Sequence, residues 1–238
     1  MRVNDPILIT GSPRSGGSMI AGITAICGGF AGNQIFDPQA PYSADMFENV
    51  AIREQIIKPY LIRGGSDKDG HFPLPMITEL DMSYKLRNRV VGAMLQQGLE
   101  GEQWFYKDSR IALTWPLWHK AFPNAKWIIV RRNPKDIVDA CCKTGFMNAY
   151  KYHTVRKKAG VHSEREGWSN MVRHYEERFL EISKQPNLCS IELWPEQLAD
   201  GDYSHMEAVM CWAGLEWNKK AKEWVEPKLW NSKNKRNL

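Results

Sequence analysis

The sequence contains no apolar run close to the roughly 20 residues that a membrane-spanning helix requires, so we expect no membrane partner. Its five cysteines are odd in number and lack the spacing of metal ligands, and we therefore expect no metal site. This cysteine usage is typical of a reducing compartment, and the charged N-terminus leads into an apolar segment without a secretion signal. Both features predict a cytoplasmic protein.

The composition is that of a folded globular protein. Hydrophobic residues make up 43% of the 238 residues, enough for one domain spanning residues 1–238. The net charge of +5 is modest, so it suits an anionic ligand but does not indicate nucleic acid as a partner. Nothing in the sequence indicates the oligomeric state.

Short apolar segments alternate with helical patterns along the chain. Strands are predicted at 7–9, 104–106, 126–130 and 188–193. Helices are predicted at 19–26, 47–60, 79–97 and 112–121, from residue 134, from 163 to about 182, and at 204–212. Residues 143–160 are polar and basic, which favours a lid or an exposed connection. The alternation predicts an α/β fold in three layers, with a mainly parallel sheet of about four or five strands flanked by helices.

The turn between the first predicted strand and helix is the feature around which the chain is organised. Residues 11–18 are almost all small or turn-forming, and they join the aliphatic strand to a helical pattern. Such a loop directs backbone N–H groups and the positive end of a helix at one point in space. Phosphate or sulfate oxygens suit that point.

The spacing of this loop resembles the nucleotide-binding pattern G-x-x-x-x-G-K-[ST]. Gly11, Gly16 and Ser18 are in register, but Gly17 stands where the pattern has lysine. That lysine normally neutralises the β- and γ-phosphates of a triphosphate, and the positive charge of this loop lies instead at Arg14. The loop therefore predicts an anion site poorly suited to ATP, with a ligand-free glycine turn as the alternative.

Charged residues also follow the second and third predicted strands. Arg131 and Arg132 come directly after the third strand, and Asn133 with the proline after it favours a helix start there. This position is the usual ligand crevice of an open α/β sheet, although a surface salt bridge is the alternative for Arg132. Lys107 ends the second strand, where the alternative to a catalytic role is an ion pair with Asp108 or another carboxylate.

With these motifs in place, the chain resembles the sulfotransferase family that uses 3′-phosphoadenosine-5′-phosphosulfate (PAPS) as donor. Pro13-Arg14-Ser15-Gly16-Gly17-Ser18 is similar to the family's 5′-phosphosulfate loop, P-[KR]-S-G-[TS]-[TS]. Arg132-Asn133-Pro134-Lys135-Asp136 is similar to its 3′-phosphate motif, R-[DN]-P-[KR]-D. Weaker similarities to family segments lie at 106–110, 122–126, 194–198 and 212–215. The resemblance covers most of the chain and implies a P-loop nucleotide-binding fold.

The resemblance also implies roles for these residues. Pro13, Arg14, Ser15, Gly16, Gly17 and Ser18 would hold the 5′-phosphosulfate, and Arg132 would hold the 3′-phosphate. Family members need no metal, which agrees with a loop that lacks the apparatus for a γ-phosphate. Lys107, together with Arg14, would stabilise the charge that develops on the bridging oxygen. Arg131 lies one place outside the motif and is predicted to be structural.

One position departs from the family pattern. The serine that usually binds the 3′-phosphate, eight residues after the motif arginine, is replaced here by Ala140. Thr144 or a backbone amide is a candidate replacement, and Lys143 or the basic residues 151–158 would add positive charge.

Transfer to a hydroxyl or amine requires a general base. Phe47-Glu48-Asn49 is similar to an F-E-[ND] segment of bacterial family members, so Glu48 is the first candidate. Its alternative role is a helix-start carboxylate. His71, in a loop, is the second candidate, and His119 is predicted to be an ordinary helix residue.

The acceptor is predicted only as a class: a small molecule, a carbohydrate or another compound with a hydroxyl or amine group. Its pocket is expected from residues 30–75 and 143–163, the least patterned parts of the chain. Two other functions remain open, an ATP-dependent P-loop phosphotransferase and a non-catalytic nucleotide-binding protein that keeps the fold.

Overall fold

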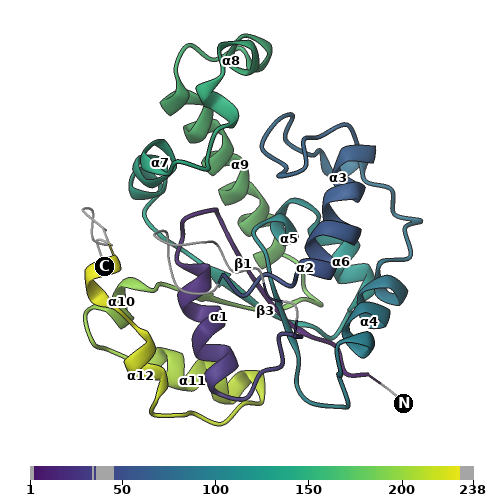
Figure 1. The fold of residues 1–238 in the computed structure, drawn as a ribbon, viewed down its shortest axis with the longest axis vertical. Coiled ribbons are helices and arrows are strands. Elements are labelled where there is room, and N and C mark those ends of the chain that lie inside the picture. The colour runs from purple at the N-terminus through teal and green to yellow at the C-terminus, as the bar shows by residue number, and fades with distance from the viewer. Residues whose placement is uncertain (1–2, 34, 36–45, 231–238) are drawn as a thin grey trace.

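A parallel four-stranded sheet forms the centre of the molecule (Figure 1). The computed structural model describes residues 3–33, 35 and 46–230. The strands in that part of the chain are β1 (Ile7–Gly11), β2 (Phe105–Lys107), β3 (Lys126–Val130) and β4 (Cys189–Leu193), in the spatial order β2-β1-β3-β4. The predicted parallel α/β sheet is therefore confirmed, with β1 in an inner position.

Helices cover both faces of this sheet because its central strands are apolar on both sides. Side chains alternate along β1, so Ile7 and Ile9 join one core while Leu8 joins the other. The first core is completed by α1 (Gly17–Ile26), α10 (Glu196–Ala199), α11 (Ser204–Ala213) and α12 (Ala221–Trp224). The second is completed by α2 (Val50–Ile52), a π-helical turn (Arg53–Ile57), α3 (Lys58–Arg63), α4 (Leu86–Gln96), α5 (Arg110–Leu113), α6 (Trp115–Ala121), α7 (Pro134–Lys143) and α9 (Glu164–Ser183).

Several helix boundaries differ from the sequence prediction, each for a local reason. The helix predicted at 79–97 begins only at Leu86, because Asp81 forms a turn in which its carboxylate accepts from the Ser83 N–H at 3.0 Å. The helix predicted at 112–121 is divided at Thr114 into α5 and α6. Pro116 has no N–H to continue the hydrogen-bond ladder across that point.

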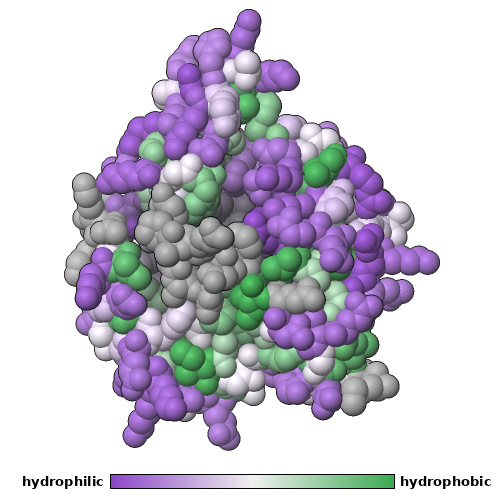
Figure 2. Space-filling view, viewed as in Figure 1, coloured by the Kyte–Doolittle hydropathy of each residue, from purple (hydrophilic) through white to green (hydrophobic). Residues whose placement is uncertain are grey.

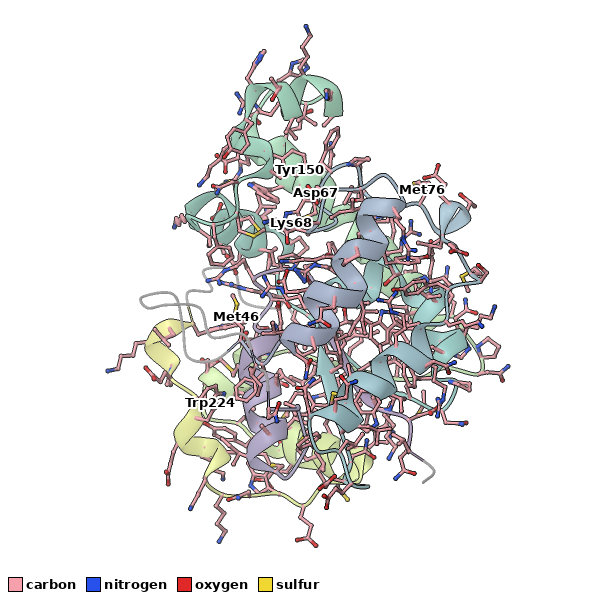
Figure 3. The ribbon with its side chains drawn as sticks, turned by 45° about the vertical axis from the view of Figure 1, so that its right-hand side comes forward. Met46, Asp67, Lys68, Met76, Tyr150 and Trp224 are labelled. Atoms are coloured by element: carbon pink, nitrogen blue, oxygen red, sulfur yellow. The ribbon has the colours of Figure 1, made fainter. Side chains whose placement is uncertain are left out.

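An arm projects beyond the carboxyl edge of the sheet (Figure 1). It consists of α7, α8 (His153–Ala159) and the first half of α9, and its surface is strongly hydrophilic (Figure 2). The predicted polar connection at 143–160 is thus largely this arm. Its base contacts the loop at 67–72, where the Tyr150 hydroxyl donates to the His71 carbonyl at 2.8 Å. Figure 3 shows Tyr150 and Asp67 side by side at this contact.

None of the helices in the described part of the chain is both long enough and apolar enough to cross a membrane.

Candidate active site

The register of the sheet brings the two predicted anion motifs together. Gly11, the last residue of β1, pairs with Val130, the last residue of β3, so the loop at 12–16 lies beside Arg132. A side chain at Gly11 is excluded, because a Cβ there would lie 2.5 Å from both Ser15 Oγ and the Val130 carbonyl oxygen. The close approach of the loop to β3 therefore depends on this glycine.

Two arginines from the two motifs contact each other. The Arg132 guanidinium donates from Nη1 to the backbone carbonyl of Arg14 at 2.9 Å, and Arg132 is only 6% exposed. Burial lowers the pKa of both guanidinium groups; for Arg132, Asp136 opposes this effect and the Arg14 charge adds to it. An anion held between the two side chains would restore the solvation that burial removes.

The loop also contains donors that lack partners. Ser12 Oγ and Arg14 Nε are buried and have no hydrogen-bond partner within the described residues. Arg14 adopts a left-handed backbone conformation with φ of 68°, and Gly16, with φ of 98°, leads into α1. Buried donors are nearly always satisfied in folded proteins, so unpaired ones in a loop at a helix start fit an anionic ligand.

Lys107 extends from the end of β2 across this loop. Its Nζ donates to Glu48 Oε1 at 2.9 Å and lies 3.4 Å from Ser18 Oγ. Gly17 leaves room for the lysine chain, because a Cβ at that position would lie 3.2 Å from Lys107 Cε. The residue that stands in place of the usual loop lysine thus allows a lysine from β2 to reach the same helix start.

Glu48 belongs to a buried network of charges. Its Oε2 lies 3.3 Å from Arg53 Nε and 3.8 Å from Arg110 Nη1. Arg110 in turn contacts Asp108 Oδ1 at 2.7 Å and Asp69 Oδ1 at 3.3 Å. Oε1 of Glu48 therefore accepts a hydrogen bond from Lys107, Oε2 forms ion pairs with two arginines, and the network connects the loop to the segment that contains His71.

The second candidate base has a different environment. The His71 ring packs edge-on against Trp168 of the arm, with centroids 5.4 Å apart. Burial lowers the pKa of His71, against the opposing effect of Asp67 and Asp69. His119 lies in the last turn of α6. Glu48, which contacts Lys107 directly, is the candidate base that the structure brings to the loop.

Other predicted residues are placed as follows. Arg131 forms ion pairs with Glu176 and Glu192, which agrees with a structural role. Thr144 does not use its hydroxyl proton for a ligand, because it donates to the Ala140 carbonyl at 2.7 Å. Lys107 forms the ion pair with a carboxylate that was the alternative to a catalytic role, and its partner is Glu48 and not Asp108.

Sequence reasoning missed Arg53 and Arg110 as partners of Glu48. Arg110 lies in the segment at 106–110 that resembles the family, and this was the one available signal for it. Within the described residues, no group of three or more His, Cys, Asp or Glu side chains is arranged to hold a metal, and all five cysteines are free.

The fold and the site together define an α/β protein with a glycine-containing loop and buried unpaired donors at the carboxyl edge of its sheet, within the described residues. The model of the sulfotransferase family matches residues 6–219, and the chain belongs to this family. Family and fold support sulfuryl transfer as the general chemistry of this enzyme. No curated protein matches the chain.

Solved sulfotransferase structures share the fold. The sulfotransferase domain from the curacin biosynthetic pathway is 14% identical, with a TM-score of 0.55 over 95% of this chain and 79% of that one. Sulfotransferase STF9 from Mycobacterium avium is 15% identical, with a TM-score of 0.59 over 94% of this chain and 67% of that one. The sulfotransferase domain from the Synechococcus PCC 7002 olefin synthase is 10% identical, with a TM-score of 0.51 over 95% of this chain and 78% of that one.

Proposed function

We propose that this enzyme transfers a sulfuryl group from PAPS to a hydroxyl or amine of a small molecule, carbohydrate or similar acceptor. The observation that supports this donor most directly is the contact between Arg14 and Arg132. PAPS carries a 5′-phosphosulfate and a separate 3′-phosphate, so it requires two anion sites about one ribose apart. Buried Arg132 and partly buried Arg14 lie on adjacent loops, and Ser12 Oγ and Arg14 Nε have no partner within the described residues, which suits that requirement.

Each residue then has a defined task. Backbone N–H groups of Arg14 and of residues 16–18, with the Arg14 side chain, hold the 5′-phosphosulfate, and Arg132 holds the 3′-phosphate. Bound there, PAPS supplies the sulfuryl group. As the acceptor oxygen or nitrogen bonds to sulfur, Glu48 takes its proton, and the bond from sulfur to the bridging oxygen breaks. Lys107 places its positive charge where negative charge then collects on the departing phosphate.

Binding of the product nucleotide, 3′,5′-ADP, tests the donor. By isothermal titration, the wild type is expected to bind it, and Arg14→Ala and Arg132→Ala each to bind about 10- to 100-fold more weakly, because each loses a charge-assisted contact. Arg173→Ala, on the exposed face of α9, is the matched control and should bind like the wild type. If the wild type does not bind 3′,5′-ADP, or if both site variants bind it as tightly as the wild type, PAPS is not the donor. A parallel titration with ATP and Mg²⁺ tests the phosphotransferase alternative.

Replacing the candidate base tests catalysis. Glu48→Gln is expected to lower kcat by about 10²–10⁴-fold, because glutamine cannot accept the acceptor's proton. His71→Asn should retain transfer. The assay measures the transfer of labelled sulfuryl groups from PAPS to each member of a panel of hydroxyl and amine acceptors. Loss of transfer in His71→Asn with activity kept in Glu48→Gln would assign the base to His71, and no transfer by the wild type would favour the non-catalytic alternative.

A further inference from the structure

The C-terminal segment, residues 218–230, packs along the helix that follows the anion loop. The family match ends at residue 219, so nearly all of this segment lies outside it. Asn218 donates from Nδ2 to the Ile26 carbonyl at 3.1 Å, and Trp224 donates from Nε1 to the Met19 carbonyl at 3.2 Å. Figure 3 shows Trp224 against α1, near Met46. The segment therefore runs back along α1 toward the loop.

Trp224 fixes this path by close packing. A Cβ at Gly22 of α1 would lie 2.2 Å from the Trp224 ring, so the glycine is what allows the indole to lie on the helix. The same ring also packs edge-on with Phe47, with centroids 5.6 Å apart. Because Phe47 directly precedes Glu48, Trp224 contacts both α1 and the segment that carries the candidate base.

Trp230, the last described residue, packs against both anion motifs. The Cζ atom of Arg132 lies 4.6 Å from the centre of the Trp230 ring, which is cation–π distance. A Cβ at Gly16 of the loop would lie 2.8 Å from a carbon of the same ring. Trp230 Nε1 is buried and has no hydrogen-bond partner within the described residues. One side chain thus packs on the loop, lies at cation–π distance from Arg132 and holds a donor without a partner within the described residues.

We propose, on the basis of the proposed function, that Trp230 is a donor-binding residue and that the C-terminal segment forms a wall of the PAPS site. Arg132 Cζ lies over the face of the Trp230 ring, and the guanidinium N–H groups extend outward in the plane of that group. The ring therefore orients Arg132 without blocking in-plane bonds to the 3′-phosphate. The buried Nε1–H is placed to donate to an oxygen of the bound nucleotide.

The charge environment favours this role over simple packing. Arg132 and Arg14 are both desolvated, and the indole face replaces part of the lost solvation of Arg132 while the nucleotide is absent. Trp212 of α11 is a second tryptophan at cation–π distance from a basic side chain, and it provides a contrast. Its ring lies 5.9 Å from the Nζ of Lys126, which begins β3 and so lies at the opposite edge of the sheet.

The experiment compares binding of 3′,5′-ADP by the full chain carrying Trp230→Leu, Trp230→Phe or Trp212→Leu. Leucine keeps apolar bulk but loses the ring, so Trp230→Leu is expected to bind about tenfold more weakly. Phenylalanine keeps the stacking face and should recover most of that loss, while Trp212→Leu should match the wild type. In transfer assays, Trp230→Leu should raise the donor KM and leave kcat at saturating donor and the acceptor KM unchanged.

The possible failures are distinguishable. Wild-type binding that Trp230→Leu leaves unchanged, or weakens no more than Trp230→Phe does, overturns this inference and leaves the proposed donor intact. Tighter binding by Trp230→Leu also overturns it, because the tryptophan then blocks the site. Absence of binding by the wild type overturns the donor itself, and the role of Trp230 with it.

Discussion

Lys107→Met is expected to lower kcat for sulfuryl transfer by about 10²–10³-fold, the effect typical of removing one preorganised donor from a developing charge. Methionine preserves most of the apolar stem that lies over Gly17, so the variant removes the charge with little change in packing. What it loses is the Nζ that contacts Glu48 Oε1 at 2.9 Å and lies 3.4 Å from Ser18 Oγ. Steady-state kinetics with labelled PAPS measures the effect.

Lys58→Met is the matched control for this prediction. Lys58 is buried and, like Lys107, pairs with a carboxylate, Glu54, at 2.6 Å, but it lies in α3 and its pair connects to Glu48 through Arg53. Its replacement should leave kcat within about threefold of the wild type, since it removes no charge from the developing phosphate. Equal losses in both variants would mean that Lys107 acts only through the stability of the network around Glu48.

The affinity for 3′,5′-ADP separates a loss of catalysis in Lys107→Met from a loss of donor binding. Lys107 acts mainly when charge collects on the bridging oxygen, so Lys107→Met should weaken 3′,5′-ADP binding less than it lowers kcat. The opposite result, a large loss of affinity with kcat unchanged, would place Lys107 among the ground-state binding residues.

The parts of the site that the sequence predicts are those fixed by local patterns. A strand of three aliphatic residues, a loop of small residues and a helix predict an anion-binding turn wherever they occur. Asn133 caps α7 as predicted, accepting from the Lys135 N–H at 3.0 Å. Because parallel strands end at one edge of their sheet, the pairing of Gly11 with Val130 then brings Arg14 and Arg132 together.

The parts that sequence reasoning misses depend on contacts between distant segments. Glu48 reaches Lys107 across 59 positions, through segments with no repeating pattern. Its further contact with Arg110 follows from where the end of β2 lies relative to α2, and no local rule encodes that. Trp230 is harder still, because a tryptophan in a lysine-rich tail resembles any packing residue until the tail is placed on Arg132.

Asp108→Asn is expected to have the largest effect on stability. Asp108 is fully buried, and its Oδ1 accepts from Arg110 Nη1 at 2.7 Å and from the Arg110 backbone N–H at 2.9 Å. Its Oδ2 accepts from the Tyr106 hydroxyl at 2.6 Å. Asparagine keeps the shape but leaves the buried Arg110 charge poorly compensated, so the free energy of unfolding should fall by about 3–5 kcal/mol. Denaturant unfolding at pH 7 measures the loss, and Asp202→Asn, an exposed aspartate bonded to Ser204, should change little.

The dependence of this loss on pH identifies its cause. Burial alone raises the pKa of Asp108, but the Arg110 charge and the Tyr106 hydroxyl outweigh it and hold that pKa below its usual value. A lowered pKa in the folded state means that the carboxylate contributes stability above the unfolded pKa of about 4, and that this contribution is lost as pH falls further. The difference between wild type and Asp108→Asn should therefore be constant from about pH 5 to 7 and shrink as pH falls below about 4. A difference that stays constant down to pH 3 would show that the pKa of Asp108 is not lowered in the folded state, and that the loss in Asp108→Asn does not come from the carboxylate charge.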